Sequence, residues 1–392
     1  ELGLFLLFVA AYCLPLALDN GSGLQFADTR VRHLLGELLA TPVVRGEIAR
    51  NLGGHLLLLV LPYLFLAALS RQLATACGAA LWAMRLPVFL AGWVFLIAVN
   101  AAAFPKSDYS VAFTALARPE LAYGLGLLLF GGLAYLLYRT FVTRRWLLIV
   151  PGLIGGGLLA SGFARFPLHQ PASPSKKNVI IVGVDSMSAV AFGKLAPSLP
   201  NLRQLMESGV SYERAYTPLG RTFPAWVSIL SGKSPVEHGA IFNLRNMESV
   251  ARQGLISSEL RSAGYRTVYA IDERRFNNID QDFGFDHVIG PRAGGLDFLA
   301  QRLNDTPLSN MLLQTGFGRM LMPFSYINTA SYTNYDADAF VDLVLNATAG
   351  AAPLFLAVHF ESAHFPFATR HAHETFAGPN PFWNRHAAAL TV

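Results

Sequence analysis

The chain has 392 residues, of which 53% are hydrophobic and only 14% are charged. This composition lies beyond that of ordinary globular proteins on the apolar side. A net charge of +5 is compatible with nucleic-acid binding, but the sequence has no basic run and no interleaved aromatic stripe. We therefore expect no nucleic-acid partner, and attraction to anionic lipid headgroups is the simpler use for the basic side chains.

The apolar excess is concentrated in the first 165 residues, where five stretches stand out. Each approaches the roughly 20 residues that a membrane-spanning helix needs. A buried core helix is the alternative for any one of them, but five in succession with few internal charges favour a membrane bundle. The stretches are Leu2–Leu18, His55–Leu69, Leu86–Phe104, Leu121–Tyr138 and Trp146–Phe163.

Basic residues predict the orientation of this bundle. Arg71 and Arg85 flank the second loop and three arginines crowd residues 139–145, so these loops are expected in the cytoplasm by the positive-inside rule. The first loop argues mildly against this, because it also carries arginines. It contains acidic residues as well, and its segment Leu34–Leu39 has the pattern of an interfacial amphipathic helix. The C-terminal part is then expected outside the membrane.

A linker rich in Pro and Ser, Phe166–Lys177, separates the two parts and predicts a semi-extended spacer. The predicted organisation is a transmembrane helical domain over 1–165, the linker over 166–177 and a catalytic α/β domain over 178–392. Both cysteines, Cys13 and Cys77, lie in the first part, so we expect no disulfide in the second.

The second part opens with an apolar, β-branched run, Asn178–Met187, which is typical of a buried strand in a parallel sheet. Asp185 sits at the carboxyl end of this strand. Ligands of open α/β sheets bind beyond the carboxyl ends of the strands, so Asp185 is a candidate metal ligand. A helix-capping role is the alternative for Asp185 alone.

Thr222 begins a second informative segment, Thr222–Gly232. Thr is a favoured N-cap, Pro224 is tolerated in a first helical turn, and Gly232 marks a stop. The free backbone N–H groups near residues 223–225 are then expected to face an anion such as a phosphate or sulfate ester. Arg221, which precedes Thr222, is a candidate substrate-binding residue.

A helix over Leu255–Ala263, closed by Gly264, and a strand over Tyr265–Ile271 follow. Asp272 ends that strand at the carboxyl edge of the expected sheet. It either joins the metal or pairs with Arg275 and shapes a loop, and the pairing is slightly favoured.

Several histidines and acids have two readings. His359 and His364 are placed on one strand, an odd number of residues apart, so alternation puts them on opposite faces. His238 is expected to be a packing and turn residue. The pair Asp286-His287 is expected to form a structural turn rather than a metal site.

The order of these motifs resembles the alkaline phosphatase superfamily, in its sulfatase-like branch, over residues 178 to about 370. The resemblance implies that Asp185 is a metal ligand, that Thr222 is both nucleophile and metal ligand, and that His364 contacts the ester or protonates the leaving group. It is carried by Val184-Asp185-Ser186, Pro200-Asn201-Leu202, Thr222-Phe223-Pro224, Ser231-Gly232, His238-Gly239 and His364-Phe365-Pro366.

Two departures decide the branch. Sulfatases that resemble this segment carry a Cys or Ser that is oxidised to formylglycine, whereas Thr222 has no route to that aldehyde. The Arg that follows in those sulfatases is Trp226 here. A Thr nucleophile resembles phosphodiesterases of the nucleotide pyrophosphatase type and the phosphoethanolamine and lipoteichoic acid transferases, which form a phospho-threonine intermediate. Five spans before an external domain is also the layout of those transferases.

Oxygen and imidazole ligands suit zinc, manganese or magnesium, and the sequence does not choose among them. The resemblance implies a further Asp-His pair on a later strand, and the chain starts at Glu1 without a Met, so we expect it to be a fragment trimmed at both ends.

The sequence thus predicts an α/β metalloenzyme anchored in a bacterial inner membrane, with its catalytic domain on the periplasmic or extracellular side. It is expected to transfer or hydrolyse a phosphoester of an envelope lipid or glycan. The alternatives are a sulfuric ester hydrolase that works without formylglycine and an inactive membrane scaffold or sensor.

Overall fold

The structure is a computed structural model whose chain divides into two compact units, each treated by itself below. The first comprises Glu1–Arg165 with Leu299–Ser325, and the second Phe166–Phe298 with Tyr326–Val392. The residues described are 42–104, 107, 110, 119–142, 176–243, 247–274, 277–291, 305–322, 325–329, 334–351, 353–364, 367 and 375–391.

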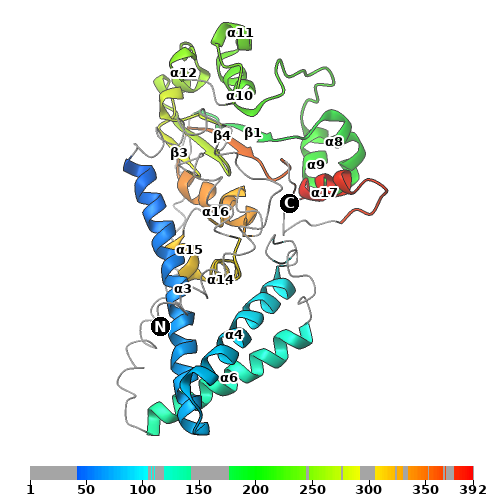
Figure 1. The fold of residues 1–392 in the computed structure, drawn as a ribbon. Helices are drawn as coiled ribbons and strands as arrows, with labels where there is room; N and C mark the ends of the chain where they lie inside the picture. Colours follow the sequence, from blue (N-terminus) through cyan, green and yellow to red (C-terminus); the bar gives the residue numbers. More distant parts are fainter. Residues whose placement is uncertain are drawn as a thin grey trace. The chain divides into compact units, whose positions relative to one another are not determined.

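The first unit is helical (Figure 1). Its long helices are α3 (Pro42–Cys77), α4 (Leu81–Ala103) and α6 (Pro119–Val142). Glycines lie where the helices meet: a Cβ at Gly92 would come 2.7 Å from Leu66, and one at Gly132 would come 2.9 Å from Leu69. These glycines therefore permit a close helix–helix approach, as is common in membrane bundles.

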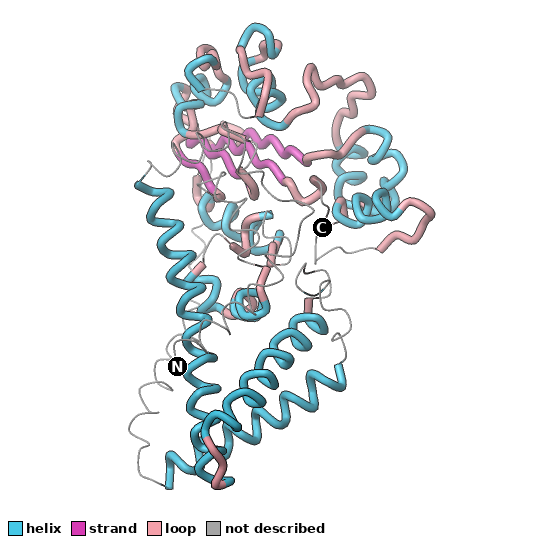
Figure 2. Tube along the Cα trace, in the orientation of Figure 1, coloured by secondary structure: helices cyan, strands magenta, loops and turns pink. Residues whose placement is uncertain are grey.

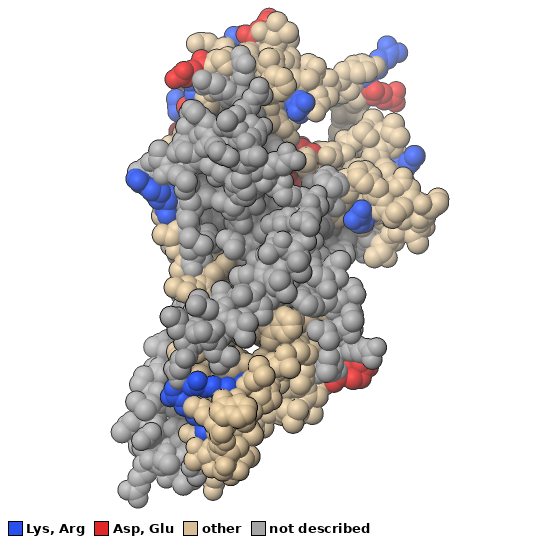
Figure 3. Space-filling model, viewed as in Figure 1, with Lys and Arg blue, Asp and Glu red and all other residues tan. Residues whose placement is uncertain are grey.

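Two of the described helical segments are long and apolar enough to cross a membrane, namely Gly53–Cys77 and Leu81–Ala103. They contain most of the second and third predicted spans, and α6 contains the fourth. On the face drawn in Figure 3, most of the described surface of this unit is uncharged, and the charged side chains gather in a few places. The first and fifth predicted spans, the interfacial segment Leu34–Leu39 and most of the linker lie outside the described residues. The count of five spans and the orientation therefore stay predictions.

The first unit also receives a segment from the second half of the chain. Helices α14 (Pro307–Leu312) and α15 (Gly316–Leu321) belong to it. Asn310 of α14 donates a hydrogen bond to the Asn100 side chain of α4 at 3.0 Å, and Asn100 in turn donates to Ser110 at 2.9 Å. All three side chains are buried, and this polar network fixes α14 against α4.

The second unit is built on a parallel four-stranded sheet with the order β1-β4-β2-β3 (Figure 2). The strands are β1 (Val179–Val184), β2 (Arg266–Ile271), β3 (His287–Ile289) and β4 (Leu354–Phe360). A parallel sheet is expected to be buried on both faces, and β2 and β4 are almost wholly buried. Because β4 lies between β1 and β2, the carboxyl ends of all three meet at one edge.

Short helices surround this sheet, and α10 begins at the candidate nucleophile. The helices are α8 (Ala189–Leu195), α9 (Pro200–Ser208), α10 (Thr222–Ser231), α11 (Pro235–His238), α12 (Ile256–Ser262), α16 (Ala337–Thr348) and α17 (Pro381–Ala389). Three-residue 3₁₀ turns are η3 (Ala196–Ser198), η4 (Met247–Ser249) and η5 (Gln281–Phe283).

Two apolar clusters hold the second unit together. The larger one packs α10 on the sheet through fully buried aromatic and aliphatic side chains, including Phe223, Trp226, Tyr269 and Phe355. The other cluster joins α8, α9 and α17, and it includes Ala363 from the chain after β4. Together the clusters fix the helices that begin or end at the sheet edge.

The predicted first strand and the predicted helix ends of this unit agree with the structure. β1 occupies most of the predicted strand, and Asp185 follows it directly. Helix α12 ends before Gly264, whose φ of 86° is the left-handed conformation expected of a helix-terminating glycine. Gly232 likewise ends α10 with φ 67°.

Gly183 of β1 lies in a tightly packed part of the sheet, near the carboxyl ends of the strands. A Cβ there would lie 2.8 Å from His359 Nδ1 and 2.9 Å from the Trp226 ring. Gly183→Ala should therefore destabilise the protein by about 1–3 kcal/mol, because buried rings must shift to admit the methyl group. Denaturant unfolding measures this. Gly193→Ala in α8 is the control, since its Cβ meets nothing within 4 Å, and it should be neutral or mildly stabilising.

Candidate active site and metal centre

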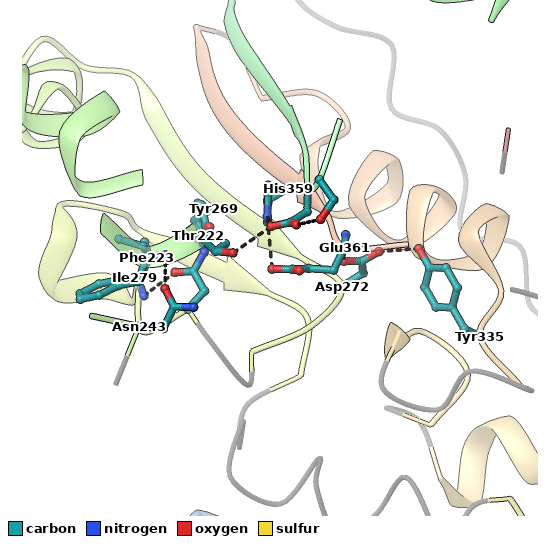
Figure 4. A network of polar contacts seen from close by, with 12 residues as sticks. Thr222, Phe223, Asn243, Tyr269, Asp272, Ile279, Tyr335, His359 and Glu361 are labelled. Carbon is teal, nitrogen blue, oxygen red and sulfur yellow. Dashed lines mark hydrogen bonds and ion pairs between the residues drawn. The ribbon is translucent and has the colours of Figure 1, made fainter. Parts of the chain in front are cut away.

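Thr222 lies at the start of α10 and faces the end of β1 (Figure 4). Its hydroxyl donates a hydrogen bond of 2.8 Å to Asp185 Oδ2. Arg221, not Thr222, is the N-cap residue, so the expectation that Thr222 caps the helix is wrong. A capping Thr would turn its oxygen back to its own helix. As the first helical residue, Thr222 presents its oxygen to another element instead.

The amino end of α10 is partly occupied by Asn243, which the sequence analysis missed. The Phe223 N–H donates to Asn243 Oδ1 at 3.3 Å, so this amide has a side-chain acceptor in place of an anion. The exposed guanidinium of Arg221 lies 5.5 Å from the ring centroid of Phe242. A single Asn in a loop carries no sequence signal of its own, since only the fold places it at the helix start.

Asp185 is the hub of the site. Ser186 Oγ donates to its Oδ1 at 2.7 Å, while Oδ2 faces Thr222 and lies 3.5 Å from His359 Nε2. Burial by itself would raise the pKa of Asp185, but the interaction with His359 and the hydrogen bond from Ser186 hold that pKa well below its usual range. Asp185 is therefore a carboxylate at any physiological pH.

His359 and Glu361 complete a buried group with Asp185. His359 Nε2 lies 3.2 Å from Glu361 Oε1, and one ligand atom from each of the three residues lies within 4.8 Å of the others. Yet neither ring nitrogen of His359 makes an aligned hydrogen bond, and Glu361 Oε2 has no partner. Buried polar atoms without partners are costly, and one imidazole with two carboxylates suits a divalent cation. These residues therefore fit a metal.

The charges in this group perturb one another. Burial disfavours the imidazolium form of His359, but the Asp185 and Glu361 carboxylates raise its pKa to about 9. Burial raises the pKa of Glu361 well above its usual range, although His359 opposes this. Shifts of this kind cluster at functional sites, and a bound cation would displace the proton that His359 holds.

Both carboxylate oxygens of Asp272 accept hydrogen bonds from neighbouring residues. Its Oδ1 accepts from the Glu361 N–H at 2.8 Å, and its Oδ2 accepts from the Tyr335 hydroxyl at 2.6 Å. Burial raises the pKa of Asp272 to about 6, although these hydrogen bonds favour its charged form. With both oxygens engaged, the carboxylate is arranged to support the chain that carries Glu361. Its role as a metal ligand stays a prediction, and Arg275, its other expected partner, lies outside the described residues.

His364 lies beyond β4, because the strand ends at Phe360. Its N–H donates to the Glu361 carbonyl at 2.8 Å in a turn, so alternation along a strand does not relate it to His359. The prediction that His359 and His364 lie on one strand is therefore wrong. His359 and Glu361 were missed, and the available signal was their spacing of two at a strand end, which places both side chains on one side.

The structural interpretation of His238 is confirmed, whereas that of the pair Asp286-His287 holds for Asp286 only, because His287 is the first residue of β3. His238 is buried, its Nδ1 accepts from the Ala240 N–H, and its Nε2 lies 2.9 Å from Ser228 Oγ. Asp286 accepts hydrogen bonds from the backbone N–H and the hydroxyl of Thr267, at 2.9 and 3.1 Å. Both residues serve turns and packing.

Comparison with known proteins agrees with this arrangement. Residues 177–388 match the model of the Sulfatase family, and the chain belongs to that family. Its domain is thus of the sulfatase and alkaline phosphatase superfamily, and enzymes of this family use divalent metals. An arylsulfatase of Clostridium perfringens is 27% identical over 141 residues, which cover 33% of this chain and 29% of that enzyme. No solved structure matches the chain.

The variant Tyr335→Phe tests whether the Tyr335 hydroxyl stabilises the buried carboxylate of Asp272. The change leaves a buried carboxylate oxygen without its hydroxyl donor, so it should lower the free energy of unfolding at pH 7 by about 1.5–3 kcal/mol. It should also raise the pKa of Asp272 further, so the loss should shrink as the pH falls below about 6, where the carboxyl group is protonated.

Denaturant unfolding between pH 5 and pH 8 measures both effects. Tyr212→Phe is the control, since that side chain is 81% exposed and should show neither. A Tyr335→Phe loss that is independent of pH would mean that the hydroxyl does not support the Asp272 carboxylate.

Proposed function

We propose that the protein transfers or hydrolyses a phosphoester through a covalent intermediate on Thr222. One observation carries the proposal: the Thr222 hydroxyl is held at a helix start on the Asp185 carboxylate, next to a mostly buried group in which His359 makes no aligned hydrogen bond and Glu361 Oε2 has no partner. A hydroxyl becomes an effective nucleophile when such an environment lowers its pKa.

The choice of a phosphoester rests on the nucleophile and its neighbour. Threonine has no route to the formylglycine aldehyde that sulfatases of the resembling pattern use. Trp226, which stands where those sulfatases have Arg, is 2% exposed and packs its ring against His359 with centroids 5.5 Å apart. Trp226 therefore forms a wall of the ligand group and supplies no cation for a substrate.

The proposed ligands of a divalent cation are Asp185 and Thr222, with His359 and Glu361 completing the set. Asp272 was expected among them and is proposed to hold Glu361 in place. When bound, a zinc, manganese or magnesium ion supplies positive charge that lowers the pKa of the hydroxyl and neutralises the anionic ester.

The chain's own residues divide the remaining work. Thr222 Oγ1 forms a bond to phosphorus as the ester P–O bond breaks. Its proton is released to water, and His364 gives a proton to the departing alkoxide. An acceptor alcohol or water then attacks phosphorus, passes its proton to His364 and releases Thr222, which regains its hydroxyl proton.

The N-terminus of α10 would bind the oxygens of the transferring group. The Phe223 N–H is held by Asn243 Oδ1, so an incoming anionic oxygen would take this donor and leave the Asn243 amide beside it. Arg221, exposed over Phe242, is proposed to contact the substrate outside the reacting group.

The substrate is proposed to be a lipid or glycan of a bacterial envelope, processed outside the inner membrane. Two apolar helices give this weak support. A sulfate ester is the second candidate, favoured by the family and by the arylsulfatase relative. An inactive scaffold or sensor is the remaining alternative, which requires that the ligand group bind no metal.

Thr222→Val should abolish the covalent intermediate and lower turnover on the order of 10³-fold, because it keeps the side-chain shape and removes the nucleophile. Thr222→Ser should retain both in part. The measurement is intact mass after incubation with a membrane extract, and turnover of an aryl phosphodiester and of an aryl sulfate. An adduct that persists in Thr222→Val would refute the nucleophile. Turnover of the sulfate alone by the wild type would move the proposal to sulfate esters.

Glu361→Gln should weaken binding of Mn²⁺ about tenfold or more, because it removes a charged ligand from the group. Glu213→Gln is the control, since Glu213 is exposed in a turn and is not among the candidate ligands. Wild-type affinity should fall as the pH is lowered from 8 to 6, by about tenfold per unit, because below a pKa of about 9 His359 must release its proton to bind a cation. Isothermal titration with Mn²⁺ measures the affinities of both variants and of the wild type at each pH. A wild-type affinity that does not change with pH would mean that His359 is not a metal ligand.

A further inference from the structure

Two residues of the second unit adopt an unusual backbone conformation beside the candidate active site. Ser186 has φ 58° and Phe367 has φ 60°, and they are the only non-glycine residues with positive φ among those that the structure describes. Ser186 follows Asp185 in the turn after β1. Phe367 follows His364, and its N–H donates to the His364 carbonyl at 2.9 Å. Such conformations persist only where surrounding contacts hold them.

The turn at Ser186 has a consequence for the site. With its backbone in the left-handed region, Ser186 places its hydroxyl 2.7 Å from Asp185 Oδ1. The other carboxylate oxygen, Oδ2, is thereby left for the Thr222 hydroxyl. Ser186 thus occupies one oxygen of Asp185, and the other oxygen faces the Thr222 hydroxyl.

One residue of α17, His386, contacts both strained residues. Its Nε2 lies 3.2 Å from the Ser186 carbonyl oxygen, and its ring centroid lies 5.0 Å from that of Phe367. A carbonyl oxygen only accepts, so Nε2 carries the proton of this hydrogen bond. Phe382 of the same helix packs edge-on against Phe367, with centroids 4.7 Å apart.

Apolar packing reinforces these contacts. Ala387 and Leu390 of α17 lie in one cluster with Ala363, from the turn after β4, and with Met187, from the turn after β1. In Figure 1, α17 lies beside α8 and α9, the helices that follow β1. Helix α17 therefore contacts the two turns that carry the candidate catalytic residues, although it contributes no candidate itself.

We propose that His386 is a positioning residue that holds the turn after β1 and the turn after β4 together. By donating to the Ser186 carbonyl and packing on Phe367, it keeps Asp185 and His364 at their places on the sheet edge. The inference deepens the proposed function and rests on it only for its effect on catalysis, since the link between the turns is a property of the fold.

The test compares His386→Leu with His386→Gln in the full chain. Leucine keeps the bulk of the ring without a donor, while the Gln Nε2 places an N–H close to that of the imidazole. Arg385→Gln is the matched control, because it changes the neighbouring residue, which is exposed on the same helix. Hydrogen exchange is followed at the amides of Asp185 and Phe367, whose N–H groups donate to the carbonyls of Phe360 and His364.

His386→Leu should speed exchange at both amides at least tenfold, His386→Gln should restore most of the protection, and Arg385→Gln should leave both amides as they are. Acceleration in only one turn, or equal loss in the Leu and Gln variants, would overturn the proposal. Mn²⁺ affinity and the rate of adduct formation at Thr222 should follow the same order among the variants. A wild type that binds no cation and forms no adduct would defeat the proposed function, while the exchange data would still decide whether His386 couples the turns.

Discussion

The site depends on the burial of two carboxylates around one imidazole at the edge of a parallel sheet. His359 and Glu361 are buried and Asp185 is mostly buried, so the charges of this group lie largely out of water. An uncompensated buried charge is strongly unfavourable. Ser186 and Thr222 donate hydrogen bonds to the Asp185 carboxylate, and a divalent cation would offset the charge of the deprotonated carboxylates. This requirement links the architecture to the proposed chemistry.

Strand register brings the cluster together. β1 and β4 run parallel with Gly183 opposite His359, so the residues that follow both strands emerge at the same edge. Gly183 has no side chain, and this leaves room for the His359 ring and for Trp226 behind it. The packing explains why a glycine stands at this position, since a methyl group would occupy the space of the imidazole.

The features that could be predicted from sequence were those with local signals. A β-branched run ending in Asp185 and a Thr-x-Pro helix start are written in a few adjacent residues, and the structure places both as expected on the sheet edge. His359 and Glu361 were missed because their partner, Asp185, lies more than 170 residues away. Only the pairing of β1 with β4 makes them neighbours, and a single sequence does not contain that register.

The residue at position 226, where this chain departs from the family pattern, is linked to the charge of the neighbouring His359. Placed one helical turn after Thr222, it points into the core beneath the site, where its ring contacts both His359 and Tyr269 edge-on. A guanidinium in this position would be buried next to an imidazole whose pKa is already about 9, and the two positive charges would repel. An arginine at 226 and a charged His359 are thus difficult to combine. The absence of an arginine at 226 and the presence of a histidine between two carboxylates are parts of one electrostatic arrangement, and the proposed nucleophile, Thr222, faces it through Asp185.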